Sequence, residues 1–271
     1  MGDDNLEDPV YEIRWCIGVA FRNWILAVPS LAMAIVGTAA VALMDPWPLT
    51  NGLFRGSPFA IPAQPFGLAD ASFYIEWATV ALIAALVGIV IEAATYLGAD
   101  DAMNNRPIEL PRLLTSGLSF VGTFVLFGLV CGGAALVVFA VVFGLTVLTK
   151  GVLAILLFPA MLCAGVAAAF GLVFTVPAMV FGRQTATGAI GLSWRLAFAN
   201  VARILPTVIG LIIVSFIAGL IGLLLLNIPY AGEVASLVIS AFLGVFQAVV
   251  ITKVYRELTS PAPPQSLADA S

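Results

Sequence analysis

Long apolar runs dominate this chain and restrict what it can fold into. Six of them are 20 or more residues long and rich in Leu, Val, Ile, Ala, Phe and Gly; they cover residues 24–43, 74–97, 117–148, 152–181, 204–226 and 234–254. A helix needs about 20 apolar residues to cross a hydrocarbon layer roughly 30 Å thick. The sequence therefore predicts six transmembrane helices.

The composition agrees with a membrane protein. Of 271 residues, 62% are hydrophobic and only 10% are charged, whereas about a quarter of the residues in soluble domains are charged. Only Lys150 and Gly151 separate the third and fourth runs, which favours helical hairpins. We predict an all-α polytopic membrane bundle of six helices in three hairpins with short interfacial amphipathic helices. It would form one domain over residues 1–259, followed by a flexible tail over residues 260–271.

The basic residues predict the orientation of the bundle. Nine of the 11 Lys and Arg residues would lie on the side of the termini, namely Arg14, Arg22, Arg106, Arg112, Arg183, Arg195, Arg203, Lys253 and Arg256. Arg55 and Lys150 would lie on the other side. Basic residues accumulate in cytoplasmic loops, so we expect both termini to be cytoplasmic and the protein to reside in a plasma (inner) membrane. The acidic segment MGDDNLEDP is unlike a secretory signal, so we expect the first apolar run to be retained.

One phrase occurs twice, as AFRNWILAVP in residues 20–29 and as AFANVARILP in residues 197–206. Each copy precedes an apolar run and has Pro six residues after Asn, which predicts a bend where a surface helix enters the membrane. In the later copy, Trp194 and Phe198 share one helical face while Arg195 and Arg203 share another, which is typical of an interfacial helix. Residues 107–120 are a degenerate middle copy in our hypothesis of a threefold repeat; three unrelated surface helices are the alternative.

The register of the repeat is open at this point. A shift of 177 residues aligns Ala, Phe, Asn and Pro, whereas a shift of 181 aligns Arg14 with Arg195 and Arg22 with Arg203. The two registers differ by about one helical turn.

Residues for familiar chemistry are scarce. The chain has no histidine and three cysteines without CxxC spacing, so it predicts no catalytic, cofactor or metal site. Its net charge of -4 and scattered basic residues argue against nucleic acid as a partner. We expect the partners to be membrane lipids and other membrane protein subunits.

Two segments suggest a family. VVITKVYREL, residues 249–258, and PAMVFGRQTATGAIGLSWRLAFAN, residues 177–200, resemble the six-span membrane domain of prokaryotic glycerophosphoryl diester phosphodiesterases and related stand-alone membrane proteins of unknown function. The resemblance implies hairpins with interfacial segments and no catalytic residues in the membrane domain. Because the enzymatic barrel of the fused proteins is absent here, it implies an anchor or interaction module.

Glu92 is the most unusual charge in an apolar run. It lies between Trp77 and Tyr96, two aromatic residues spaced to mark the two membrane interfaces. We predict an ion pair between Glu92 and Arg14, Arg22 or Arg106 near the cytoplasmic interface. The alternative is a proton or cation site, since carboxylates inside membranes are costly and often functional.

Small residues recur every fourth position in several runs. Examples are GLVCG in residues 128–132 and AALVG in residues 84–88. Such spacing lets helices approach closely, either within the bundle or with another subunit.

The segment between the first two runs is long and contains several aromatic residues. Trp47, Phe54, Phe59 and Phe66 stand in it beside five prolines. Exposed aromatic residues favour a surface that something covers, so these four are candidate partner contacts. The alternative is that they lie on the bilayer or cap the bundle itself.

Three functions are compatible with these patterns. A non-catalytic anchor, scaffold or accessory subunit of a larger membrane assembly fits best. A permease or lipid-handling channel is the alternative, and its selectivity would depend on Gln184, Asn200, Ser215 and Asn227. An intramembrane enzyme is least favoured, because acid-base chemistry needs positioned titratable groups.

Overall fold

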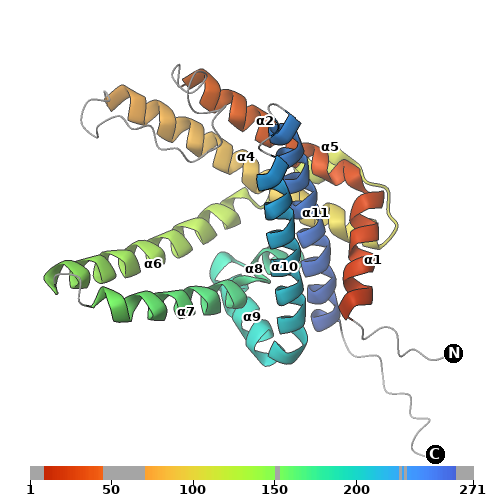
Figure 1. The fold of residues 1–271 in the computed structure, drawn as a ribbon. Helices are drawn as coiled ribbons and strands as arrows, with labels where there is room; N and C mark the ends of the chain where they lie inside the picture. Colours follow the sequence, from red (N-terminus) through yellow and green to blue (C-terminus); the bar gives the residue numbers. More distant parts are fainter. Residues whose placement is uncertain (1–8, 45–70, 150–152, 226–227, 229–230, 261–271) are drawn as a thin grey trace, which may run out of the picture.

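The protein is an all-α membrane bundle. The computed structural model describes residues 9–44, 71–149, 153–225, 228 and 231–260, and this part contains no strand (Figure 1). Its helices are α1 (Pro9–Arg22), the 3-10 turn η2 (Trp24–Leu26), α2 (Ala27–Met44), α4 (Ala71–Met103), α5 (Leu110–Leu118), α6 (Val121–Leu148), α7 (Ala154–Leu172), α8 (Thr175–Val180), α9 (Ala186–Ala199), α10 (Val201–Leu225) and α11 (Ala231–Thr259). The predicted fold class is confirmed. The loop from Asp45 and the tail beyond Ser260 lie outside the described residues.

The long helices match the predicted spans. Five segments of the described chain are long and apolar enough to cross a membrane: Ala78–Met103, Val121–Leu148, Leu157–Val180, Val201–Leu225 and Val234–Thr259. The number becomes six if Ile13–Arg22 and Trp24–Ile35, which meet at an angle of 76°, form one bent span. This bend falls where the repeated phrase predicts it.

The fourth span is interrupted near its end. α7 runs through Pro159, but the chain breaks between Leu172 and Thr175 before continuing as α8. Pro177 has no N–H group with which to continue the helical hydrogen bonds across this break. Both prolines were predicted to kink the run; Pro159 is accommodated inside a helix, and the interruption lies just ahead of Pro177.

The two copies of the repeated phrase form the same junction. Asn23 ends α1 with φ -111° and ψ 39°, and Asn200 ends α9 with φ -124° and ψ 33°. The side-chain amide of Asn23 donates to the carbonyl of Val19 at 2.9 Å, and that of Asn200 to the carbonyl of Leu196 at 3.0 Å. The register of 177 residues is therefore the structural one, and the arginine register of 181 is not.

The middle copy adopts the same arrangement without the asparagine. α5 ends at Leu118 and α6 starts at Val121 after a short turn. In the register that superposes Gly117 on Ala197 and Ala20, all three positions are buried. At Gly117, a Cβ would stand 2.6 Å from the carbonyl oxygen of Val90, so this helix lies against the backbone of α4. The described residues thus support the threefold repeat, each unit having a short helix followed by two longer ones.

The second long helices of the three units meet at one end. α11 packs along α4 and α2, and α8 contacts both α4 and α11. Their buried residues, among them Ala99, Phe174, Met179, Phe246 and Val249, form one core. The α6 and α7 hairpin extends away from this core, as Figure 1 shows on the left.

Candidate functional site

The charged residues gather where α4, α8 and α11 meet. We call Asp100, Asp101, Phe181, Tyr255 and Arg256 the three-helix junction. Arg256 Nε donates to Asp100 Oδ1 at 2.9 Å, and the guanidinium carbon lies 4.5 Å from the centre of the Phe181 ring. One arginine of α11 therefore contacts α4 by an ion pair and the end of α8 by a cation–π interaction.

Asp101 orders the connection from α4 to α5. Its carboxylate accepts a hydrogen bond from Arg112 Nη2 and lies 3.6 Å from Arg106 Nη1. Asp101 is buried while both arginines are largely exposed, so the arginines cover the carboxylate from the water side. Burying this carboxylate without such partners would cost several kcal/mol, by analogy with roughly 3–5 kcal/mol for broken buried pairs.

Tyr255 lies under the ion pair and fills the space between the helices. Its ring centre is 6.2 Å from that of Phe174 and 6.1 Å from that of Phe181. A Cβ at Gly182 would lie 3.2 Å from the Tyr255 hydroxyl and 2.7 Å from the carbonyl oxygen of Ala178. The chain after α8 therefore needs glycine here to pass over the tyrosine.

The junction has the chemistry of a clamp. Its two carboxylates each have an arginine partner, and no group of three metal-ligating side chains occurs among the described residues. Sequence analysis used these arginines only to predict orientation. The Asp100–Asp101 pair at the end of an apolar run was the available signal for the junction, and it was missed.

The predicted interfacial helix is α9, and it docks through Ser193. The Ser193 hydroxyl donates to the carbonyl of Gly171 at 2.6 Å and accepts from the N–H of Phe174 at 3.0 Å. These groups lie on either side of the break between α7 and α8, so one side chain satisfies the interrupted backbone. Trp194 packs on Gly171, where a Cβ would stand 2.6 Å from the indole.

The other predicted residues of this helix are divided between two elements. Trp194, Arg195 and Phe198 are exposed on α9, and the Phe198 ring stacks on Trp194 at 5.1 Å. Arg203 belongs to α10, beyond the Asn200 junction, and pairs with Glu257 of α11 at 2.7 Å. The helical face drawn through Arg195 and Arg203 is therefore broken at Asn200.

The structure does not bring Glu92 together with its predicted partners. Arg106 pairs with Asp101, and Arg14 and Arg22 are exposed on α1. In the described part of the chain Glu92 has no ion-pair partner within 4.0 Å. The predicted loop contacts Trp47, Phe54, Phe59 and Phe66 lie outside the described residues.

The polar residues suggested for a channel serve the helices themselves. The Ser215 hydroxyl donates to the carbonyl of Leu211 at 2.6 Å and accepts from Gln247 Nε2 at 3.0 Å, which ties α10 to α11. The Asn200 amide forms the junction described above, Gln184 is exposed after α8, and Asn227 is outside the described residues. These residues do not line a shared cavity.

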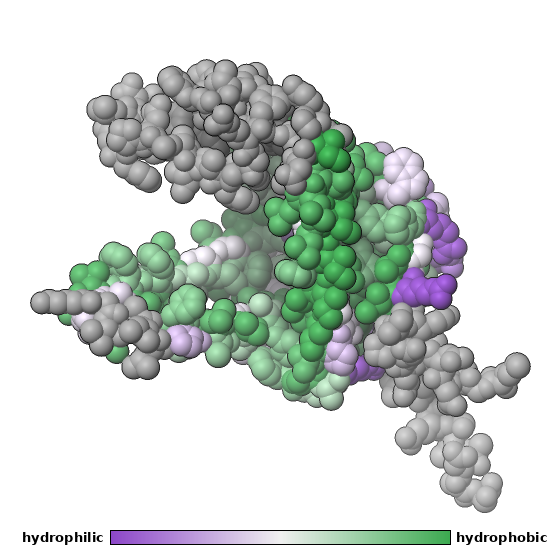
Figure 2. Space-filling model, in the orientation of Figure 1, coloured by the Kyte–Doolittle hydropathy of each residue, from purple (hydrophilic) through white to green (hydrophobic). Residues whose placement is uncertain are grey.

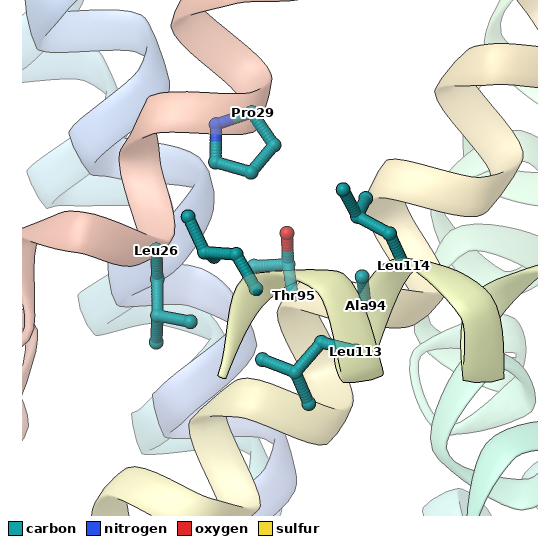
Figure 3. Close-up of a pocket in the computed structure, with 7 residues that line it drawn as sticks. Leu26, Pro29, Ala94, Thr95, Leu113 and Leu114 are labelled. Atoms are coloured by element: carbon teal, nitrogen blue, oxygen red, sulfur yellow. The ribbon is translucent and has the colours of Figure 1, made fainter. Parts of the chain in front are cut away.

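A small apolar pocket lies between η2, α2, α4 and α5. Figure 3 shows its lining, which is Leu26, Pro29, Ala94, Thr95, Leu110, Leu113 and Leu114. Thr95 has the only polar side chain in that lining, and its hydroxyl donates to the carbonyl of Ile91 at 2.8 Å. The pocket therefore offers a polar ligand little to bind.

The chain stands apart in comparisons with known proteins. No protein family, no curated protein and no solved structure matches it.

Proposed function

We propose that this chain is a non-catalytic integral membrane protein that acts as an anchor, scaffold or accessory subunit of a larger membrane assembly. The observation that carries the proposal is the exposure of α6. Leu136, Val137, Val138 and Phe139 are 70%, 61%, 46% and 66% exposed. Successive residues of a helix point about 100° apart. Every face of this part of α6 is therefore open to lipid or to another protein.

Small residues on α6 favour another protein over lipid alone. No atom lies within 4 Å of where a Cβ would stand at Gly128 or Gly132, outside the helix itself. Two glycines four residues apart make a shallow strip along which a second helix can approach closely. Of the two uses that the sequence allows for this spacing, contact with another subunit is the one we propose.

The arrangement of charge supports a membrane anchor with one charged end. Figure 2 shows hydrophobic colour over the α6 and α7 hairpin and α10, and hydrophilic colour on the side of α1 and α5. Lys253 near the end of α11 lies 5.3 Å from the ring centre of Trp15 on α1. The first and last described helices thus meet near the junction, which supports our proposal that both termini are cytoplasmic in a plasma (inner) membrane.

The test is recovery of a partner from native membranes. A tagged full chain would be extracted with its lipids into polymer-bounded discs, with a photo-cross-linking residue at Val137 of α6. Ile213 of α10, also more than half exposed, is the matched control position. We expect a stoichiometric protein partner that cross-links from Val137 and less from Ile213. A chain that is recovered alone and cross-links only to lipid from both positions contradicts the proposal.

A further inference from the structure

Glu92 is a carboxylate on an open face of a membrane span. It lies within Ala78–Met103, and its residue is exposed. Asp100 comes eight residues later, which corresponds to about 12 Å along a helix. Glu92 therefore lies about two turns farther into the apolar part of the protein than the ion pairs of the junction.

Its lack of a partner sets Glu92 apart from the carboxylates nearby. Asp100, Asp101 and Glu257 each pair with an arginine, whereas the described chain supplies no cation to Glu92. A carboxylate in the middle of a transmembrane helix costs roughly 2.5–3.5 kcal/mol on insertion scales. A basic group placed against Glu92 would offset that cost, and the chain itself does not provide one.

The residues beside Glu92 leave room for a helix. Ala81, Ala85 and Gly88 precede it by 11, 7 and 4 residues and so lie on the same helical face. Ala81 and Ala85 are exposed, and nothing lies within 4 Å of a Cβ placed at Gly88. A second helix could pack along these small side chains until its own side chain reaches the carboxylate.

We infer that the face of α4 formed by Ala81, Ala85, Gly88 and Glu92 docks a transmembrane helix that carries a lysine or arginine, with that cation against Glu92. The inference rests on the proposed function and specifies the chemistry of the partner. A lipid amine fits less well, because headgroups lie at the membrane interface while Glu92 lies about 12 Å farther along the helix than Asp100.

The experiment uses synthetic transmembrane peptides as probes. The full chain, with a fluorescent donor on an added C-terminal tag, is reconstituted in phosphatidylcholine bilayers with acceptor-labelled Leu/Ala peptides. One peptide carries a single Arg about one third from its end, and its matched peptide carries Gln there. We expect the wild-type chain to bind the Arg peptide about tenfold more tightly, in line with 1–2 kcal/mol for polar contacts between membrane helices.

Three variants decide whether Glu92 provides that preference. Glu92→Gln keeps the shape of the side chain and should reduce the preference to less than about twofold, and Gly88→Leu should weaken binding of both peptides. Glu109→Gln, which removes an exposed carboxylate outside the spans, is the control and should leave the preference unchanged. No preference in the wild-type chain, or full preference in Glu92→Gln, overturns the inference. Thermal unfolding of each variant shows that it is folded.

Two further results separate this inference from its alternatives. If native mass spectrometry finds phosphatidylethanolamine held by the wild-type chain but not by Glu92→Gln, and that lipid abolishes the peptide preference, the face binds lipid and the inference fails. If native membranes yield the same partner with wild-type and Glu92→Gln chains, this face is not its dock although the proposed function stands. A chain recovered alone counts against the proposed function, and the peptide assay still decides the chemistry of the face.

Discussion

Asn23 and Asn200 end two helices, 177 residues apart, with the same hydrogen bond. Each side-chain amide donates to the carbonyl four residues earlier, at 2.9 and 3.0 Å. The bond satisfies a carbonyl that the broken helix would otherwise leave without a partner. The following helix can then leave at a new angle, which is 76° at the first junction.

Loss of either amide should destabilise the protein to a similar extent. We expect Asn23→Ala and Asn200→Ala each to lower the free energy of unfolding by about 1 kcal/mol, the usual value for one hydrogen bond. Thermal unfolding in detergent measures the effect. Thr259→Ala, which removes a similar side-chain bond in the last turn of α11, is the control and should cost less. Unequal losses at the two asparagines would contradict the equivalence of the junctions.

The ion pair of Arg256 with Asp100 should couple α11 to α4. The side chains are 47% and 12% exposed, compared with 57% and 30% for Arg203 and Glu257. We expect a coupling energy of about 1 kcal/mol for the first pair and less than about 0.5 kcal/mol for the second, since exposure weakens ion pairs. Double-mutant cycles with Arg256→Gln and Asp100→Asn, and with Arg203→Gln and Glu257→Gln, measure both. The reverse order would remove the junction as the stronger contact.

Ser193 should be among the most sensitive polar positions. Ser193→Ala leaves the carbonyl of Gly171 and the N–H of Phe174 buried without a partner, which should cost about 2–4 kcal/mol at 1–3 kcal/mol for each group. Ser193→Cys should cost less, because cysteine occupies the equivalent position 16 in the first unit and is buried there. Chemical unfolding of both variants tests this. Equal stability of wild type and Ser193→Ala would show that water replaces the hydroxyl.

Gly117 should tolerate no larger residue. Its Cβ would stand 2.6 Å from the carbonyl oxygen of Val90, a backbone atom that cannot turn aside. We expect Gly117→Ala to destabilise the protein by about 1–3 kcal/mol, as overpacking does. Gly144→Ala in α6 is the matched control, because nothing lies within 4 Å of its Cβ. Similar stabilities for the two variants would place α5 farther from α4 than the structure does.

The orientation remains a prediction that reporters can test. Fusions at Gly2 and after Ser271 should both report the cytoplasmic side, and one near Gly56 should report the outside, because basic residues are retained in the cytoplasm. Glu92→Gln in the same fusions should leave the result unchanged. An external C-terminus would reverse the orientation or change the number of crossings.

The sequence by itself determined the membrane class, the helical hairpins and the bends of the repeated phrase. These depend on local properties: the length of apolar runs, the position of proline, and an asparagine that bonds within its own helix. The same locality limits what it determines, and two registers of the repeat remained because both fit a surface helix.

Only the tertiary structure decided which charges meet. The sequence offered Arg14, Arg22 and Arg106 to Glu92, but Arg106 lies at Asp101 and the other two arginines are on α1, away from it. Asp100 and Arg256 are 156 residues apart, and no local pattern connects them. Their contact exists because α4, α8 and α11 pack side by side, and side-chain packing between distant segments sets such distances.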